Sequence, residues 1–433
     1  MMILYHIQHK QEEGVIEMSA GQKGGGQKRG TEDVFKKLGL GEVEITSMGS
    51  EMTSWPLCIV AGGLNVDIQG FIGGRYRKGD SNPGIILKTM GGVGRNIAET
   101  MVRLHMPVEL FTMLGESEEW NEIIHTVTQL GIGLSLCPRY GDLPIPTYVC
   151  IIERDGGLIG AVSDMRALDV LRAEHFERVV SVFDHAFCIV VDGNIPSECI
   201  EWLANRYGRL DVGKGGDGGF PQASSLTIDT NINEKSSSRP ILVADPVSVA
   251  KAAKFRGCLG AFDAAKPNFQ EAAAIAGLSD MPQSIENALV IIDHLKKQTL
   301  LPGEFYLSLG EEGMLVAKDE NIELVPLPSP DLRPPQINRS GAGDAECAVI
   351  AWAEMVQRLY SILEPKHFLN LRPPLKARLA LSAAMLKASE AAPASESLRM
   401  ELLCESTGFW YPEATEEAAH LAECCSKITA ALQ

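Results

Sequence analysis

The sequence predicts an α/β protein built on a mostly parallel sheet. From residue 57 onward, short apolar runs alternate with segments whose apolar residues recur at helical spacing, and most of the runs end in polar residues or glycine. Strands that end in this way and are followed by helices are typical of a parallel sheet that binds ligands at the carboxyl ends of its strands. The expected core strands are 57–61, Val108–Leu114, Phe187–Val191, Ile241–Ala244 and Phe305–Leu309.

Helices, a hairpin and an insertion complete this pattern. Apolar spacing predicts helices over Ile97–Leu104 and Trp120–Leu130. The runs Tyr148–Glu153 and Leu158–Val162 flank an Arg-Asp-Gly-Gly sequence, which is a hairpin signature. Residues 211–239 are rich in glycine, serine and charge, and they predict a surface insertion between a helix and a strand that leaves the sheet intact.

The most informative motif is Ser-Gly-Ala-Gly-Asp at 340–344, which an apolar, helix-prone run follows. Gly341, Ala342 and Gly343 present main-chain amides at the start of a helix, and the helix dipole adds positive potential, so an anion can bind there. A carboxylate beside an anion site is repulsive unless it accepts a proton from the group that attacks the anion. Amides that hold a phosphoryl group, with Asp344 as the base, are what phosphoryl transfer to an alcohol needs. The alternative is a glycine-rich turn in which Asp344 is an ordinary residue of a helix N-terminus.

A second glycine-rich region lies upstream. After an apolar run that ends in a glycine pair, Asn65 and Asp67 alternate with apolar residues, so both lie on one face of an extended segment and can hold vicinal hydroxyls. A Gly-Gly-Val-Gly-Arg-Asn motif then opens a helical run, and its glycines Gly91 and Gly92 let a ligand approach the backbone. Asn96 either caps this helix or reaches a sugar hydroxyl, and the alternative for Asp67 is a turn-stabilising role.

These motifs resemble those of the PfkB/ribokinase family of sugar and nucleoside kinases, over roughly residues 55–395. Lys-Pro-Asn-Phe-Gln-Glu at 266–271 is similar to the family's lysine–proline–asparagine segment, and Ser-Leu-Gly-Glu-Glu-Gly at 308–313 is similar to its nucleotide loop. The finer details resemble the pseudouridine kinases of that family most. These details are Gly-Gly-Val-Gly-Arg-Asn-Ile-Ala-Glu at 91–99, Asp164-Met165, the segment Asp245–Lys251, and Ala388-Ser389-Glu390.

The resemblance implies a ribokinase-like three-layer α/β/α sandwich with a small β lid, whose strands lie within about 64–90 and 146–163. It implies ATP and Mg²⁺ as cofactors and a nucleoside or sugar as the acceptor, with pseudouridine, converted to pseudouridine 5′-phosphate, as the first choice. Three alternatives stay open. The first is another kinase of the family that acts on ribose, adenosine or a ketose, and the second is a catalytically silent, nucleotide-binding regulator. The third is an interaction scaffold that uses the terminal extensions.

The resemblance also assigns roles to individual residues. Asp344 is the expected base, with the amides of Gly341, Ala342 and Gly343 around the transferring group. The expected substrate ligands are Asn65, Asp67, Gly91, Gly92, Asn96, Asp164 and Asn194. The expected nucleotide ligands are Asn268, Ser308, Gly310, Gly313, Gly341 and Gly343, and Glu271 is expected to hold the metal through a water. Met165 either faces the base of the nucleoside or packs in the core.

The chain departs from the family pattern around its catalytic motif. Many members carry an acid and a threonine before Gly-Ala-Gly-Asp, where the acid helps to hold a monovalent cation. Asn338, Arg339 and Ser340 stand here instead, which puts activation by K⁺ in doubt, and Arg339 is a candidate replacement for the cation. Glu346 stands where the family commonly has an aromatic or apolar residue. Because a buried, unpaired carboxylate is costly, either Glu346 has a partner, for which Arg339 is a candidate, or this helix face differs.

Composition limits the classes of partner. The formal net charge is −17, from 39 Lys and Arg against 56 Asp and Glu, which argues against nucleic acid or an anionic membrane as a partner. The ten cysteines show no Cys-x-x-Cys pair and several lie in apolar runs, so we expect reduced thiols in a cytoplasmic enzyme. Residues 1–54 are expected to be a flexible extension and 396–433 a helical one. A homodimer is open, since some family members pair through their lid strands.

Overall fold

The computed structural model describes residues 57–153, 157–209, 239–278, 280–336, 340–365, 369–390 and 398–432. Its centre is a nine-stranded sheet. From one edge to the other, its strands are β15 (Asn321–Val325), β14 (Met314–Lys318), β13 (Glu304–Ser308), β12 (Ala264–Ala265), β11 (Ile241–Asp245), β10 (Cys188–Asp192), β1 (Cys58–Ala61), β4 (Val108–Phe111) and β6 (Ile132–Gly133).

The sheet is mostly parallel, as predicted. The strands from β13 to β6 pair in parallel, and β14 and β15 add an antiparallel edge. The central strands β1, β10 and β11 are buried along their whole length, which explains why they read as continuous apolar runs without alternation. The prediction of a single strand over Val108–Leu114 is wrong. The chain leaves the sheet after Phe111, and β5 (Leu114–Gly115) pairs with β7 (Arg139–Tyr140) in a separate two-stranded sheet.

Two hydrophobic clusters line the opposite faces of this sheet. Alternate residues of β1 divide between them, with Cys58 and Val60 in one cluster and Ile59 and Ala61 in the other. The first cluster is covered by α2 (Val93–Arg103), α3 (Glu118–Gln129), α11 (Ala342–Leu363), α12 (Pro373–Ala388), α13 (Met400–Trp410) and α14 (Thr415–Leu432). The second is covered by α4 (Ala173–Glu177), α5 (Val180–Asp184), α6 (Ser197–Tyr207), α8 (Val249–Ala252), α9 (Phe269–Ala276) and α10 (Ile285–Lys297). The predicted three-layer α/β/α sandwich is confirmed.

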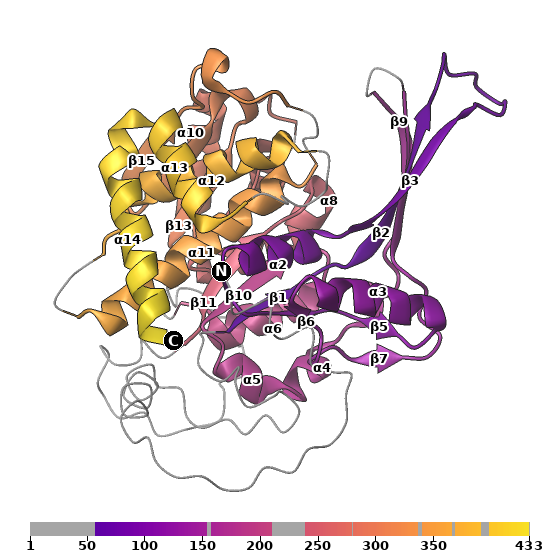
Figure 1. The fold of residues 1–433 in the computed structure, drawn as a ribbon, viewed down its shortest axis with the longest axis horizontal. Coiled ribbons are helices and arrows are strands. Elements are labelled where there is room, and N and C mark those ends of the chain that lie inside the picture. The colour runs from indigo at the N-terminus through magenta and orange to yellow at the C-terminus, as the bar shows by residue number, and fades with distance from the viewer. Residues whose placement is uncertain are drawn as a thin grey trace, which may run out of the picture.

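A four-stranded sheet projects from one side of this body (Figure 1). Its strands, in order, are β3 (Gly84–Gly91), β2 (Asn65–Ile72), β8 (Thr147–Ile152) and β9 (Leu158–Asp164). They come from the two segments expected to carry lid strands, and β8 and β9 form the expected antiparallel hairpin. Because β2 follows β1 after three residues, the lid is joined directly to the centre of the main sheet.

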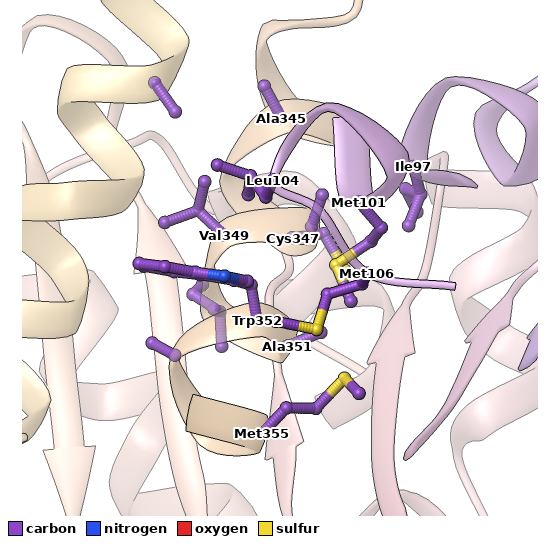
Figure 2. Close-up of a cluster of buried hydrophobic side chains, with 14 of the residues drawn as sticks. Ile97, Met101, Leu104, Met106, Ala345, Cys347, Val349, Ala351, Trp352 and Met355 are labelled. Carbon is purple, nitrogen blue, oxygen red and sulfur yellow. The ribbon is translucent and has the colours of Figure 1, made fainter. Parts of the chain in front are cut away.

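The helices α2 and α11 pack against each other over the sheet and bring two distant glycine motifs together. Figure 2 shows Met101 of α2 and Met106 from the turn after it beside Cys347 and Ala351 of α11. The buried residues in the first half of α11 include the small residues Ala345, Cys347, Ala348 and Ala351, which allow a close approach. The packing places the N-terminus of α11 beside the first turns of α2.

The C-terminal helices α13 and α14 pack on α11 and α12 as part of the first cluster. Their apolar spacing predicted a helical extension. In the structure, this extension consists of two helices joined by a short turn. Residues 1–54 and nearly all of the segment 211–239 lie outside the described residues. None of the helices in the described part of the chain is long and apolar enough to cross a membrane.

Candidate active site

The N-terminus of α11 lies at the carboxyl edge of the main sheet. Gly341 is the N-cap residue and adopts a left-handed conformation with a φ of 80°, which favours glycine. The helix packs against β10, β11 and β12, so its first turn lies beside the ends of these strands. The first amides of a helix have no acceptor within the helix, and those of Ala342 and Gly343 are therefore suited to binding an anion, as the motif predicted.

Asp344 lies in this first turn and is held by a residue from α2. The Asn96 amide nitrogen Nδ2 donates to the Asp344 carboxylate oxygen Oδ2 at 2.7 Å. Burial raises the pKa of Asp344 to about 6, while the hydrogen bond from Asn96 and the charge of Lys266 act to lower it. Asn96 does not cap α2, because Gly92 occupies the N-cap position. The capping alternative for Asn96 is therefore wrong, and its side chain orients a carboxylate on another helix.

The glycines of the 91–96 motif allow α2 to approach the turn after β1. Gly92 has a φ of 101°, and a Cβ atom there would lie 2.4 Å from the carbonyl oxygen of Gly63. A Cβ on Gly94 would lie 2.8 Å from the carbonyl carbon of Gly62. These close approaches make a side chain at either glycine incompatible with the observed packing.

Arg95 of the same motif is not available as an anion ligand. Its guanidinium is buried and donates to the Glu99 carboxylate and to the Met90 carbonyl oxygen. The cation thus fixes α2 to the end of β3.

Asn65 and Asp67 lie side by side at the start of β2, as their alternation predicted. The Asn65 side-chain nitrogen Nδ2 donates to Asp67 Oδ1 at 2.6 Å. Burial raises the pKa of Asp67, and the hydrogen bond from Asn65 and the charge of Arg95 oppose the shift. Gly91 pairs with Asn65 in the sheet, and a Cβ on Gly91 would lie 2.3 Å from Asp67 Oδ2. Gly91 therefore leaves space for the Asp67 carboxylate.

Asp192, which the sequence did not single out, organises the end of β10. Its buried carboxylate accepts hydrogen bonds from the main-chain nitrogens of Gly63 at 2.8 Å and Asn194 at 2.7 Å. Asn194 is thereby fixed next to the turn that precedes β2, and its side-chain oxygen accepts a hydrogen bond from Lys251 Nζ. The only available signal in the sequence is that Asp192 ends an apolar strand.

The turn after β11 is strained. Val247, a β-branched residue, has a φ of 71°, and such a conformation is uncommon outside functional loops. Its main-chain nitrogen donates to Asp245 Oδ1 at 2.9 Å. This turn passes close to Gly193, where a Cβ would lie 2.6 Å from the Pro246 carbonyl oxygen. The strained turn and Lys251 therefore border the same end of the sheet as Asn194.

The residues expected to bind the nucleotide lie at the ends of β12 and β13. Asn268 and Glu271 form a reciprocal capping box at the start of α9. The Asn268 main-chain nitrogen donates to Glu271 Oε2 at 2.9 Å, and the Glu271 main-chain nitrogen donates to Asn268 Oδ1 at 2.9 Å. Asn268 and Ser308 also form an isolated bridge between the two segments. In the nucleotide loop, Gly310 and Gly313 have φ values of 61° and 100°.

The donor set fits a magnesium ion that keeps most of its waters. The Asn268 side-chain nitrogen Nδ2 donates to Glu271 Oε1 at 2.8 Å, so each carboxylate oxygen of Glu271 accepts one hydrogen bond and retains a lone pair for a metal-bound water. Among the described residues, no group of three or more His, Cys, Asp or Glu gathers to hold a metal ion. Mg²⁺ bound to phosphates needs no such group, because it coordinates waters and one or two carboxylates.

Asp164 has different contacts from the other residues expected to bind the substrate. It ends β9 on the lid, opposite Thr147, and Arg166 pairs with its carboxylate at 2.6 Å. The hydrogen bonds from Arg166 lower the pKa of Asp164 to about 2. A role in substrate binding therefore requires that this ion pair faces the ligand or opens.

Glu346 has partners other than the one considered from sequence. The Ser308 hydroxyl donates to Glu346 Oε2 at 2.8 Å, and Lys266 Nζ lies 3.5 Å from the same oxygen. Asn338 and Arg339 lie outside the described residues. The buried carboxylate is thus paired by a lysine that precedes the Asn268 segment.

Comparison with known proteins finds kinases among the proteins similar to this chain. No family model matches the chain. It is 30% identical over 168 residues to the uncharacterized sugar kinase YeiI of Escherichia coli strain K12, which covers 39% of this chain and 46% of that protein. The chain therefore aligns with less than half of the length of this relative. It is 25% identical over 300 residues to the pseudouridine kinase of the same organism, covering 68% of this chain and 82% of that enzyme.

The solved structure of Arabidopsis thaliana ribokinase complexed with ribose and ATP shares the fold, with a TM-score of 0.59 at 18% identity, over 82% of this chain and 99% of that chain. The chain therefore has a ribokinase-like fold, and its sequence is similar to a sugar kinase and a pseudouridine kinase. The fold expected from four short motifs is thereby confirmed. The motifs meet at one edge of the sheet, since α11 lies between the Asn65 side and the Ser308 side.

Proposed function

We propose that the protein transfers the γ-phosphoryl group of ATP to a hydroxyl of a nucleoside or sugar. The contact between Asn96 and Asp344 carries this proposal. The carboxylate of Asp344, whose pKa is raised by burial, lies in the first turn of α11, and the helix that bears Asn96 begins just after Gly91, the sheet partner of Asn65. An anion site, a base and a pair of hydroxyl-binding side chains are the elements that phosphoryl transfer to an alcohol requires.

In the proposed reaction, Asn65 and Asp67 hold vicinal hydroxyls of the acceptor, and Asp344 accepts a hydrogen bond from the attacking hydroxyl. Its carboxylate orients that oxygen and takes the proton as the new bond to phosphorus forms. The amides of Gly341, Ala342 and Gly343 face the negative charge on the transferring group, and such donors are worth about 10²–10³ in rate. Mg²⁺, when bound with ATP, neutralises charge on the phosphates, and Glu271 would hold one of its waters.

The proposed acceptor is pseudouridine, and the product is pseudouridine 5′-phosphate. The 25% identity to a pseudouridine kinase over most of that enzyme supports this choice. The strained turn at Val247 and the adjacent Lys251 give the acceptor side donors and a shaped surface for a polar base. Asp164 and Met165 at the end of β9 are proposed to face that base from the lid.

The test is steady-state turnover with ATP and a panel of pseudouridine, uridine, adenosine and ribose. The expected result is the highest kcat/KM with pseudouridine, together with loss of turnover in Asp344→Asn. A higher kcat/KM with another acceptor would assign a different substrate within the family. ATP binding without turnover on any acceptor would replace the kinase by a nucleotide-binding regulator.

We also propose that a second copy of the chain covers the lid sheet. The lid exposes large apolar side chains on β3, β8 and β9, among them Ile86 at 74% and Val162 at 69% exposure. An exposed apolar sheet of this kind is unusual on a monomer. Sedimentation of the wild type as a dimer, and of Ile86→Lys with Val162→Lys as a monomer, is the expected result. A monomeric wild type would contradict it.

A further inference from the structure

One buried carboxylate joins three of the four family motifs. Glu346 lies in the second turn of α11, directly after the anion-binding residues, and only 8% of it is exposed. Its oxygen Oε2 accepts a hydrogen bond from the Ser308 hydroxyl and lies 3.5 Å from Lys266 Nζ. Ser308 opens the nucleotide loop, and Lys266 precedes Asn268. Glu346 therefore connects the anion turn with both segments expected to bind the nucleotide.

The ammonium of Lys266 lies directly beneath the anion turn. A Cβ atom on Gly343 would lie 2.8 Å from Lys266 Nζ. Burial opposes protonation of Lys266, but the neighbouring carboxyl groups of Asp245, Glu346 and Glu271 outweigh it and raise its pKa above the ordinary value. A fixed positive charge is therefore present next to the amides that would hold a phosphate.

A buried ion pair needs a reason, because removing two charges from water costs more than their attraction commonly returns. Apolar residues of similar size at both positions would fill the same space without this cost. The same region also carries the acidic groups Asp344, Asp245 and Glu271, which interact with Lys266 or with one another. Without Lys266, these groups would disfavour a polyanion, so the retained cation has an electrostatic use at this position.

We infer that Glu346 is a positioning residue for the nucleotide, which holds Lys266 beneath Gly343 and Ser308 at the start of the nucleotide loop. The inference rests on the proposed kinase function. The charged pair Glu346–Lys266 sets the potential at the anion turn, and the hydrogen bond to Ser308 keeps the loop in register with α11. Loss of the carboxylate charge lets Lys266 Nζ move away from Gly343, and loss of the acceptor oxygen, as in Glu346→Leu, also releases the Ser308 hydroxyl.

The same helix offers a matched control. Glu354 lies eight residues further along α11, and its Oε1 accepts a hydrogen bond from the fully buried Lys376 at 2.5 Å. This pair is also a buried Glu–Lys contact, but it lies about 12 Å further along the helix axis at 1.5 Å per residue. The other partner of Lys376 is Glu304, which lies at the start of β13, away from the carboxyl edge of the sheet. A purely structural effect of losing such a pair is expected equally at both positions.

The experiment compares Glu346→Gln and Glu346→Leu with Glu354→Gln in the full chain. ADP affinity is measured by calorimetry, KM for ATP and kcat by turnover, and the melting temperature by heating. Both Glu346 variants are expected to bind ADP about tenfold more weakly or worse, the size expected for loss of one charge-assisted contact. Glu354→Gln is expected to change ADP affinity less than twofold while it lowers the melting temperature.

A change in ADP affinity that is no larger for Glu346→Gln than for Glu354→Gln overturns the inference. So does a Glu346→Leu variant that melts as the wild type does and binds ADP with wild-type affinity. The binding readout separates this outcome from failure of the proposed function. If the wild type binds ADP but phosphorylates no acceptor, the kinase proposal fails, and the comparison of ADP affinities still decides the role of Glu346.

Discussion

Replacing Asn96 by alanine tests how the protein sets the basicity of its proposed catalytic carboxylate. Burial raises the pKa of Asp344 to about 6, and the hydrogen bond from Asn96 Nδ2 at 2.7 Å is the largest influence that lowers it. The charge of Lys266 adds to this lowering. Asn96→Ala removes the hydrogen bond and leaves the burial, so the pKa of Asp344 rises further.

The size of the shift follows from the energy of the bond. A hydrogen bond to a charged group contributes about 1.5–3 kcal/mol, and one pKa unit corresponds to about 1.36 kcal/mol. The expected rise is therefore about 1–2 units, which takes the pKa of Asp344 from about 6 to about 7–8. At pH 7 the ionised fraction falls from about 90% to between about 10% and 50%. Turnover at pH 7 is then about two- to tenfold lower from protonation alone.

The assay is the pH dependence of kcat and of kcat/KM between about pH 5 and about pH 9.5, on both sides of the expected pKa values. A base acts when deprotonated, so the acid limb of the Asn96→Ala profile is expected to move to higher pH, and much of the activity returns at alkaline pH. Asn65→Ala is the matched control. It removes the analogous amide from Asp67, so it is expected to raise KM for the acceptor and to leave the acid limb of kcat in place. An acid limb that stays at the wild-type pH in Asn96→Ala would show that Asp344 is not the titrating base.

Three further predictions concern the same charged groups. Asp344→Asn is expected to lower kcat by about 10²–10⁴ with ADP affinity nearly unchanged. Burial raises the pKa of Asp344 from 3.8 to about 6. Ionisation of Asp344 therefore lowers the stability of the folded state increasingly as the pH rises from 3.8 to about 6, and by the full amount above about 6. Chemical denaturation should therefore find this variant more stable by up to about 3 kcal/mol at pH 8 and no more stable at pH 4. Lys376→Met removes the lysine that Glu304 and Glu354 share, while Lys318 still pairs with Glu304 at 2.9 Å. Its free energy of unfolding is expected to fall by about 3 kcal/mol, the lower end for breaking a buried pair. Since a neutral Asn338 and a cationic Arg339 precede the motif, turnover is expected to be independent of K⁺, and strong activation by added K⁺ would contradict this.

The sequence predicted the site as a set of motifs, because each motif is local. A glycine that must adopt positive φ, as Gly92 and Gly341 do, or a helix that begins at a glycine turn leaves a signature within a few residues. The buried strands were equally readable as continuous apolar runs. These features gave the fold class and the edge of the sheet at which ligands bind.

The contacts within the site could not be predicted in this way. Asn96 and Asp344 are 248 residues apart, and only the packing of α2 on α11 brings them together. The same limit explains why Asp192 was overlooked, since its role depends on its main-chain partner Gly63, 129 residues away. The partner of Glu346 was sought in the nearby Arg339, whereas β12 and α11 place Lys266 next to it. Sequence reasoning finds partners that are close along the chain, and the order of strands in the sheet determines the rest.

The distribution of charge explains how a chain with a net charge of −17 can bind a polyanion. The cation of the first glycine motif, Arg95, is bound to Glu99 and to the Met90 carbonyl oxygen. Lys266, the cation of the Lys-Pro-Asn segment, is paired with Glu346. Both cations have carboxylate partners, so the proposed direct contacts to phosphate are the main-chain amides at the start of α11. Amide dipoles attract phosphate without a mobile charge, and they leave Asp344 as the ionisable group that the acceptor meets. Removing Glu346 is therefore expected to weaken ADP binding because the Lys266 ammonium moves away from the turn, and not because a phosphate contact is lost. This is why ADP affinity is the decisive measurement.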